Sequence, residues 1–162
     1  MRKSVLTLLL FALLFNACSA VPQKAKMNAQ APELSAKTLS GDPVTLSKNY
    51  AGKVIVLRFW MMGCSSCTQA MPLLDTLQEK YPDTLAIIAV NSINEIKEIA
   101  TFETHSKFHY PLLKDDMDIT AKRYNVRSVP IMFLIDNQGV LKEVIHGELP
   151  WEEAEKIIMK YL

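Results

Sequence analysis

The sequence has little cysteine, little glycine and no excess of either charge. Of its 162 residues, 3 are cysteine and 5 are glycine, and 18 basic residues face 17 acidic ones. The near-neutral balance argues against a nucleic-acid partner, and three cysteines are too few for a disulfide framework. Hydrophobic residues make up 49% of the chain and charged residues 22%. This composition excludes a disordered protein and favours a globular one.

No apolar run is long enough to prefer spanning a bilayer, which takes about 20 residues. The longest such run, residues 5–15, follows Arg2 and Lys3 and precedes the small residues of the segment 16–20. A positive start, an apolar stretch and small residues at its end are typical of a secretory signal. We therefore expect residues 1–17 to be a signal peptide and the mature protein to be exported.

Cys18 allows two interpretations of this leader. Residues 15–18 resemble a bacterial lipobox, which implies cleavage before Cys18 and its lipidation; acyl chains retain a protein at a membrane. The alternative is ordinary cleavage after Ala20, which yields a soluble periplasmic protein. We favour a lipid-anchored protein of the bacterial cell envelope that faces the periplasm. Under both interpretations only Cys64 and Cys67 remain as free thiols, which indicates a redox centre.

Residues 18–31 are polar and without periodicity, and we expect them to form a tether. Residues 32–162 then form one domain in which strand and helix patterns alternate. The predicted strands cover residues 43–46, 54–60, 85–90, 131–136 and 140–146; the predicted helices cover residues 65–81, 94–106, 117–124 and 151–162. This order predicts an α/β fold with a mixed sheet flanked by helices.

The segment Cys64-Ser65-Ser66-Cys67 lies where a predicted buried strand passes into a helix. Residues three apart on a helix are neighbours, so the two sulfurs can form a disulfide with little backbone movement. At the helix start, unpaired N–H groups and the helix dipole lower the pKa of Cys64 and favour its thiolate. We therefore predict that Cys64 is the exposed nucleophile and that Cys67 is the buried thiol that resolves the mixed disulfide.

Several motifs in order resemble thioredoxin-like proteins of the TlpA/ResA type. They are Gly52-Lys53-Val54-Ile55-Val56-Leu57-Arg58-Phe59-Trp60, the segment with both cysteines, Met71-Pro72, Ala89-Val90-Asn91, and Ser128-Val129-Pro130-Ile131-Met132-Phe133-Leu134-Ile135-Asp136 followed by Gly139. The resemblance implies a thioredoxin fold and exchange of thiols and disulfides with other exported proteins. Family members often keep cysteines of apocytochromes or copper sites reduced. It therefore implies a reductase that is supplied by an upstream membrane electron donor and needs no cofactor.

The resemblance also assigns roles to two prolines. It implies that the Val129–Pro130 bond is cis and lies beside the active disulfide, although cis bonds are uncommon even before proline. The Val129 backbone would then be free to pair with a substrate strand and orient it for attack. Pro72 falls inside the predicted helix over residues 65–81, where an interior proline causes a kink.

Three positions depart from the family pattern or remain ambiguous. Gly63 stands where a tryptophan usually precedes the first cysteine. Arg58 replaces an asparagine or aspartate; it is either a cation that lowers a thiol pKa or a side chain that reaches past the sheet edge to water, and we favour the second interpretation. Glu95 is either a proton acceptor or the N3 residue of a capping box that begins at Ser92, and we favour the box.

The remaining candidates point to other functions and carry less weight. His105 follows Cys67 by too many residues for a zinc finger, and Pro111 disfavours a helix through His109, so we expect no metal site. A peroxidase of the same fold usually has Pro and Thr upstream of its cysteine, and residues 60–63 offer neither. A copper-binding relative uses a different cysteine spacing and a partnering histidine.

Overall fold

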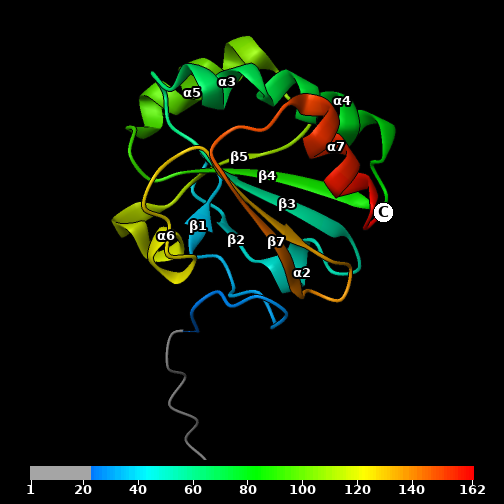
Figure 1. Ribbon diagram of the computed structural model, residues 1–162. Coiled ribbons are helices and arrows are strands. Elements are labelled where there is room, and N and C mark those ends of the chain that lie inside the picture. Colours follow the sequence, from blue (N-terminus) through cyan, green and yellow to red (C-terminus); the bar gives the residue numbers. More distant parts are fainter. Residues whose placement is uncertain (1–22) are drawn as a thin grey trace, which may run out of the picture.

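A seven-stranded mixed sheet forms the centre of the computed structural model, which describes residues 23–162 (Figure 1). The strands are β1 Ala36–Lys37, β2 Pro43–Val44, β3 Val54–Phe59, β4 Leu85–Asn91, β5 Leu112–Lys114, β6 Ile131–Ile135 and β7 Leu141–His146. Their order across the sheet is β2-β1-β5-β4-β3-β6-β7. Strands β3, β4 and β5 are parallel, whereas β6 pairs antiparallel with both β3 and β7. The predicted α/β class and mixed sheet are confirmed.

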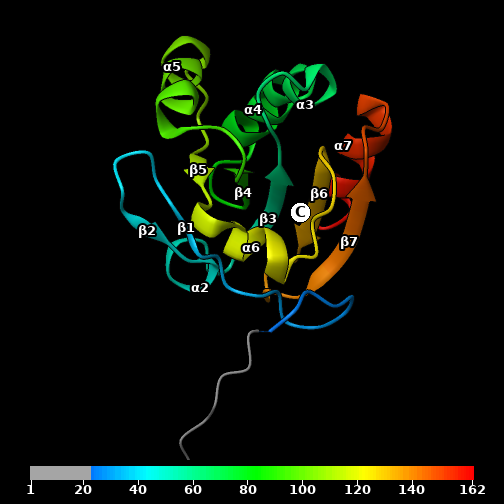
Figure 2. The same ribbon diagram turned by 90° about the vertical axis from the view of Figure 1, so that its left-hand side faces the viewer.

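Helices cover both faces of this sheet (Figures 1 and 2). The helices are α2 Leu46–Asn49, α3 Ser65–Gln69, α4 Met71–Lys80, α5 Ile96–Ser106, α6 Ile119–Arg123 and α7 Trp151–Met159, with a short 3₁₀ turn at Asp116–Asp118. Buried residues of α3, α4, α5 and α7 pack in one hydrophobic cluster, and residues of α2 and α6 pack in the other. The sheet therefore separates two cores.

Strand β3 lies in the interior of the sheet, between β4 and β6, and its sequence explains why. Val54 and Val56 belong to the core beneath α4, whereas Ile55 and Leu57 belong to the core beneath α6. All six residues of the strand are buried. A strand covered on both faces is apolar on both apart from side chains that find a polar partner, as Arg58 does here, and burial of each large aliphatic side chain contributes about 1.5–3 kcal/mol. This strand leads directly to the segment that carries the cysteines.

The helix predicted over residues 65–81 consists of two helices. Helix α3 ends at Gln69 and α4 starts at Met71, with Ala70 between them. Pro72 lies in the first turn of α4, where the N–H that proline lacks would have no partner within the helix. The proline therefore lies at the start of a helix, and the kink predicted within one long helix is a break between two helices.

Part of the segment predicted as a tether, residues 25–31, is bonded to the domain. The N–H groups of Ala25, Asn28 and Ala31 donate to carbonyl groups of the domain at 2.8–2.9 Å, and the Ala29 carbonyl accepts the N–H of Leu141 at 2.9 Å. Residues 25–31 thus lie along α6 and β7, and the domain begins before Pro32. The predicted signal peptide and Cys18 lie outside the described residues. Among residues 23–162, no helix is long and apolar enough to span a bilayer.

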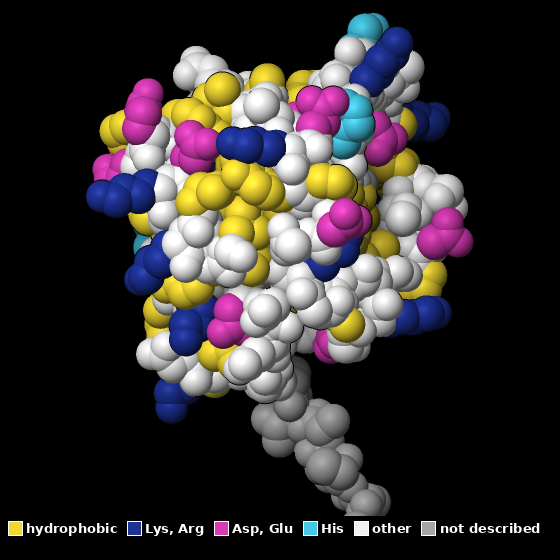
Figure 3. Space-filling model, turned by 90° about the vertical axis from the view of Figure 1, so that its right-hand side faces the viewer, with side chains coloured by type: hydrophobic (Ala, Val, Ile, Leu, Met, Phe, Trp, Pro, Cys, Tyr) yellow, Lys and Arg dark blue, Asp and Glu magenta, His cyan; other side chains and the backbone are white. Residues whose placement is uncertain are grey.

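The C-terminal helix α7 packs against the same hydrophobic core as α4. Leu149, Trp151, Ile157 and Tyr161 are partly buried and pack against the cluster that includes Met71. Figure 3 shows hydrophobic side chains gathered on this face of the molecule, with charged side chains around them. The loop that enters α7 is consequently held near the elements that carry the cysteines.

Candidate active site

Cys64 and Cys67 form a disulfide at the end of the sheet where β3 passes into α3, and their Cα atoms are 5.2 Å apart. Cys64 is the N-cap residue of α3 and is partly exposed, whereas Cys67 is fully buried. The predicted difference in exposure between the two residues is thus confirmed. Their chemical roles as nucleophile and resolving thiol stay a prediction.

The start of α3 surrounds the Cys64 sulfur with donors. The Cys67 N–H donates to Cys64 Sγ at 3.2 Å, and Ser66 Oγ lies 3.5 Å from the same sulfur. The Thr68 N–H donates to the Cys64 carbonyl, which begins the helical ladder. Such donors at a helix start stabilise a thiolate more than a thiol. After reduction, the arrangement can therefore hold Cys64 as the attacking anion.

Two asparagines from the end of β4 hold the loop that precedes Cys64. Asn91 is fully buried, and its Oδ1 accepts the N–H groups of Ile93 and Asn94. Asn94 Oδ1 accepts the N–H of Met62 at 2.8 Å and the Asn91 amide at 3.0 Å. This role of Asn94 was not predicted from the sequence. The available signal was an Asn-x-x-Asn segment after a strand parallel to β3, because parallel strands bring such segments to one edge.

The Val129–Pro130 bond is cis, as the resemblance implied. Pro130 is buried and precedes β6, and the first residue of β6, Ile131, pairs with the last residue of β3, Phe59. A groove of about 510 Å³ adjoins this segment, lined by Met61, Ser92, Ile93, Asp118, Ala121, Lys122, Val126, Arg127, Ser128 and Val129. The register thus brings the Val129 segment to the same end of the sheet as the cysteines.

Arg58 does not reach water, so the favoured interpretation of this residue is wrong. Its side chain is only 1% exposed, because β3 is a central strand whose face is covered by α3 and by the loop before α7. Its Nη2 lies 2.5 Å from the Glu148 carboxylate, 3.4 Å from the Cys67 carbonyl oxygen and 3.5 Å from the Ser66 carbonyl oxygen. A buried guanidinium, paired with a partly exposed carboxylate, thus lies directly against the helix that carries Cys67.

The capping box of α5 lies three residues later than predicted. Glu95 is the N-cap, and its N–H donates to the Glu98 carboxylate at 3.2 Å. The shift arises because Asn91 accepts the N–H groups of Ile93 and Asn94 and so holds residues 91–94 in a turn. Ser92 therefore caps no helix. Glu95 is exposed, and its alternative role as a proton acceptor stays a prediction.

The histidines do not converge on the cysteines. His109 Nδ1 lies 3.0 Å from Asp75, and its Nε2 lies 3.2 Å from Glu79. The hydrogen bond to Asp75 raises the pKa of His109, and the charge of Glu79 adds to this effect. His105 Nδ1 lies 2.6 Å from a carbonyl oxygen of its own helix. Across residues 23–162, no cluster of three or more His, Cys, Asp or Glu residues is arranged to hold a metal ion.

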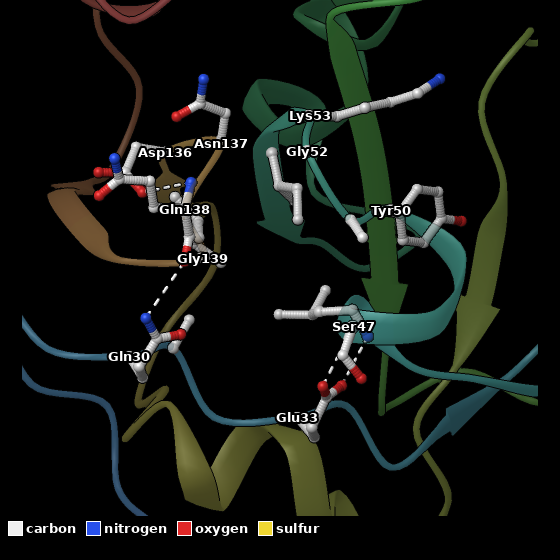
Figure 4. A pocket seen from close by; sticks show the side chains of 15 residues that line it. Gln30, Glu33, Ser47, Tyr50, Gly52, Lys53, Asp136, Asn137, Gln138 and Gly139 are labelled. Carbon is white, nitrogen blue, oxygen red and sulfur yellow. Dashed lines mark hydrogen bonds between the residues drawn. The ribbon is translucent and has the colours of Figure 1, made fainter.

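A separate cavity of about 250 Å³ lies at the opposite end of β3 (Figure 4). Glu33 accepts the N–H of Leu46 at 2.6 Å and that of Ser47 at 3.0 Å, which caps the start of α2. The Gln30 amide donates to the Gln138 carbonyl across the cavity mouth. These bonds join the N-terminal segment to α2 and to the β6–β7 turn, so this site has a structural role far from the disulfide.

Comparison with known proteins places this geometry among thiol–disulfide oxidoreductases. The model of the AhpC/TSA family matches residues 27–144. The chain is 36% identical over 130 residues to the thioredoxin-like protein YneN of Bacillus subtilis, which covers 78% of this chain and 75% of that protein. It is 30% identical over 131 residues to the thiol-disulfide oxidoreductase ResA of Geobacillus kaustophilus, covering 80% and 75%.

A solved structure agrees with these relatives. The crystal structure of a Chlorobium tepidum protein assigned as the thiol:disulfide interchange protein DsbE superimposes with a TM-score of 0.77. The two sequences are 26% identical, and the match covers 85% of this chain and 99% of the other. The sheet and its flanking helices are therefore those of a thioredoxin-like protein, and this fold carries the Cys64–Cys67 disulfide.

Proposed function

Because the chain belongs to the AhpC/TSA family and is a thiol–disulfide oxidoreductase of thioredoxin-like fold, we propose that Cys64 and Cys67 carry its exchange reaction. The observation that supports this assignment is the pairing of a partly exposed Cys64 at the start of α3 with a fully buried Cys67. An exposed sulfur is accessible to a protein substrate, and a buried one is protected from it.

In the reductase direction, the Cys64 thiolate attacks one sulfur of a substrate disulfide. A Cys64–substrate disulfide forms, the substrate S–S bond breaks, and the second substrate sulfur leaves as a thiolate that takes up a proton. Cys67 then loses its proton and attacks the Cys64 sulfur, which releases the first substrate sulfur as a thiolate. The chain loses two electrons and the substrate gains two.

Val129 and Pro130 orient the substrate in this proposal. The groove beside Val129 supports the role, since Met61 from the loop before Cys64 and Val129 both line it. Backbone pairing of a substrate strand with Val129 would bring the substrate disulfide toward Cys64 without recognising its sequence. The apolar groove residues, among them Met61 and Ile93, would contact the flanking substrate side chains.

The place of work and the partners are part of the proposal. The leader and Cys18 support export and lipid anchoring in the bacterial cell envelope, with the domain facing the periplasm. The substrates are then exported proteins whose cysteines must be reduced, such as those that receive haem or copper, and a membrane electron donor restores the Cys64–Cys67 dithiol. We expect Cys18→Ser to move the protein from the membrane fraction to the soluble one. Unchanged membrane retention would contradict the lipid anchor.

One set of assays tests the proposed activity against the two alternatives. We expect the full chain to accelerate the reduction of insulin by dithiothreitol and the Cys64→Ser variant to have no effect. A peroxidase would instead consume hydrogen peroxide with turnover, and a copper module would bind copper stoichiometrically with no effect on insulin. Peroxide turnover or copper binding without insulin reduction would overturn the proposal.

A further inference from the structure

We propose that the buried Arg58 stabilises the Cys67 thiolate, that Glu148 partly offsets its charge, and that the balance of the two sets how readily the Cys64–Cys67 disulfide is reduced. The inference rests on the proposed function of the two cysteines. It assigns to Arg58 and Glu148 a role as positioning residues, because they act through Cys67 and touch no substrate.

The position of Arg58 places a positive charge against the backbone of Cys67. The side chain extends from the central strand β3 on the face covered by α3, and only 1% of it is exposed. Its Nη2 lies 3.4 Å from the Cys67 carbonyl oxygen and 3.5 Å from that of Ser66. Charges in an interior are weakly screened, so a cation this close to the Cys67 backbone also acts on the Cys67 sulfur.

Two nitrogen atoms of the Arg58 guanidinium donate no hydrogen bond to the described residues. Within the part of the chain that the structure describes, Arg58 Nε and Nη1 are buried and have no acceptor. Trp60 Nε1, two residues along the same strand, is likewise buried without one. A buried donor without an acceptor is costly, and a disulfide sulfur is a poor acceptor. Reduction creates a thiol and then a thiolate on Cys67, and in this proposal the thiolate is the anionic partner of the guanidinium beside its backbone. The unpartnered donors therefore favour the reduced form.

Glu148 limits this effect. Its carboxylate, in the loop between β7 and α7, lies 2.5 Å from Arg58 Nη2, and its side chain is 29% exposed. A carboxylate at this distance offsets much of the guanidinium charge that the Cys67 sulfur experiences. The effect of Arg58 on the sulfur is thus the difference between a buried cation and its counter-charge. The two residues consequently have opposite effects on the dithiol–disulfide equilibrium.

The test measures this equilibrium in the full chain, held in detergent and equilibrated with buffers of reduced and oxidised dithiothreitol. Alkylation and mass spectrometry of the peptide that contains Cys64 and Cys67 give the reduced fraction. We expect Arg58→Met to shift the equilibrium constant toward the disulfide by about tenfold, the factor that one unit of thiol pKa represents. Glu148→Gln should shift it several-fold toward the dithiol. Arg58→Lys keeps the positive charge and should retain most of the wild-type equilibrium constant. Glu152→Gln removes an exposed acid from the first turn of α7 and should change the equilibrium constant less than twofold.

A second readout separates charge from structural damage. In a Cys64→Ser background, the pH dependence of Cys67 alkylation should move to higher pH with Arg58→Met and to lower pH with Glu148→Gln. If Arg58→Met does not fold, the sign of the Glu148→Gln shift decides. If the wild type cycles but both variants shift in the same direction, or neither variant shifts, the inference is overturned and the proposed function is left intact. A wild type that does not cycle at all would overturn both.

Discussion

At the scale of single residues, the two sulfurs differ in exposure, and their loss should have different consequences. With Cys67→Ser, Cys64 can still attack a substrate disulfide, but no second thiol releases the product. We predict that this variant accumulates a mixed disulfide with insulin, seen as a heavier band on non-reducing gels and by mass spectrometry. Cys64→Ser is the matched control and should form little or none. A mixed disulfide that accumulates through Cys67 in the control would reverse the proposed roles.

His109 is a residue whose contribution to stability depends on pH. The hydrogen bond to Asp75 raises its pKa in the folded protein, so folding favours the protonated ring. The stabilisation is fully present below the unfolded pKa of about 6.5 and is lost as the pH rises through the raised folded value. We predict that His109→Gln lowers the midpoint of urea unfolding more at pH 5.5 than at pH 9.

The control for this prediction is His146→Gln. His146 is exposed and has no acidic partner within 4 Å in the described part of the chain. Its replacement should therefore change the unfolding midpoint by the same small amount at both pH values. A His109→Gln effect that grows with pH would show that the ion pair with Asp75 does not contribute as proposed.

At the scale of elements, the junction between β3 and α3 depends on the turn that follows β4. Asn94→Ala removes the acceptor of the Met62 N–H and leaves the buried Asn91 amide without a partner. We predict a loss of about 1–3 kcal/mol in the free energy of unfolding and faster hydrogen exchange at the Met62 amide. Asn137→Ala, in the exposed β6–β7 turn, should cost less than about 0.5 kcal/mol. Unchanged exchange at Met62 would show that Asn94 does not hold this loop.

The sequence was most informative where local pattern and tertiary role agree. A largely apolar run that is followed shortly by two cysteines three residues apart predicts a buried strand that leads to a disulfide at a helix start. Strand β3 and helix α3 confirm this prediction. The predicted strands over residues 131–136 and 140–146 are also present as β6 and β7, which pair antiparallel. These features depend on short-range spacing, which a sequence displays directly.

The errors share a physical cause, which is contact between segments far apart in the chain. Arg58 is buried because Glu148, 90 residues later, provides its counter-charge, and no local pattern signals such a pair. The capping box moved because Asn91 forms a turn that competes with a helix start at Ser92. The break between α3 and α4 at Ala70 could have been predicted from the sequence, since proline is favoured in the first turn of a helix and Pro72 follows two residues later.

At the scale of the whole molecule, residues 25–31 belong to the folded domain. They contribute four backbone hydrogen bonds, and Ala25 and Ala31 pack against the core beneath α6. We predict that a chain starting at residue 32 unfolds with a free energy roughly 2–6 kcal/mol lower than one starting at residue 23, from about 0.5–1.5 kcal/mol for each of the four net hydrogen bonds. Urea unfolding of the two chains measures the difference. Equal unfolding midpoints would show that residues 25–31 do not stabilise the domain and would support the domain start predicted at Pro32.

The account as a whole depends on one reversible reaction, the opening and closing of the Cys64–Cys67 disulfide in the folded protein. Peptide-resolved mass spectrometry after alkylation measures it directly, in the full chain treated first with dithiothreitol and then with a disulfide-bonded protein such as insulin. We predict that both cysteines are alkylated after the first step and neither after the second, while insulin gains the two electrons. A folded chain in which the pair stays in one form through both treatments would contradict the account.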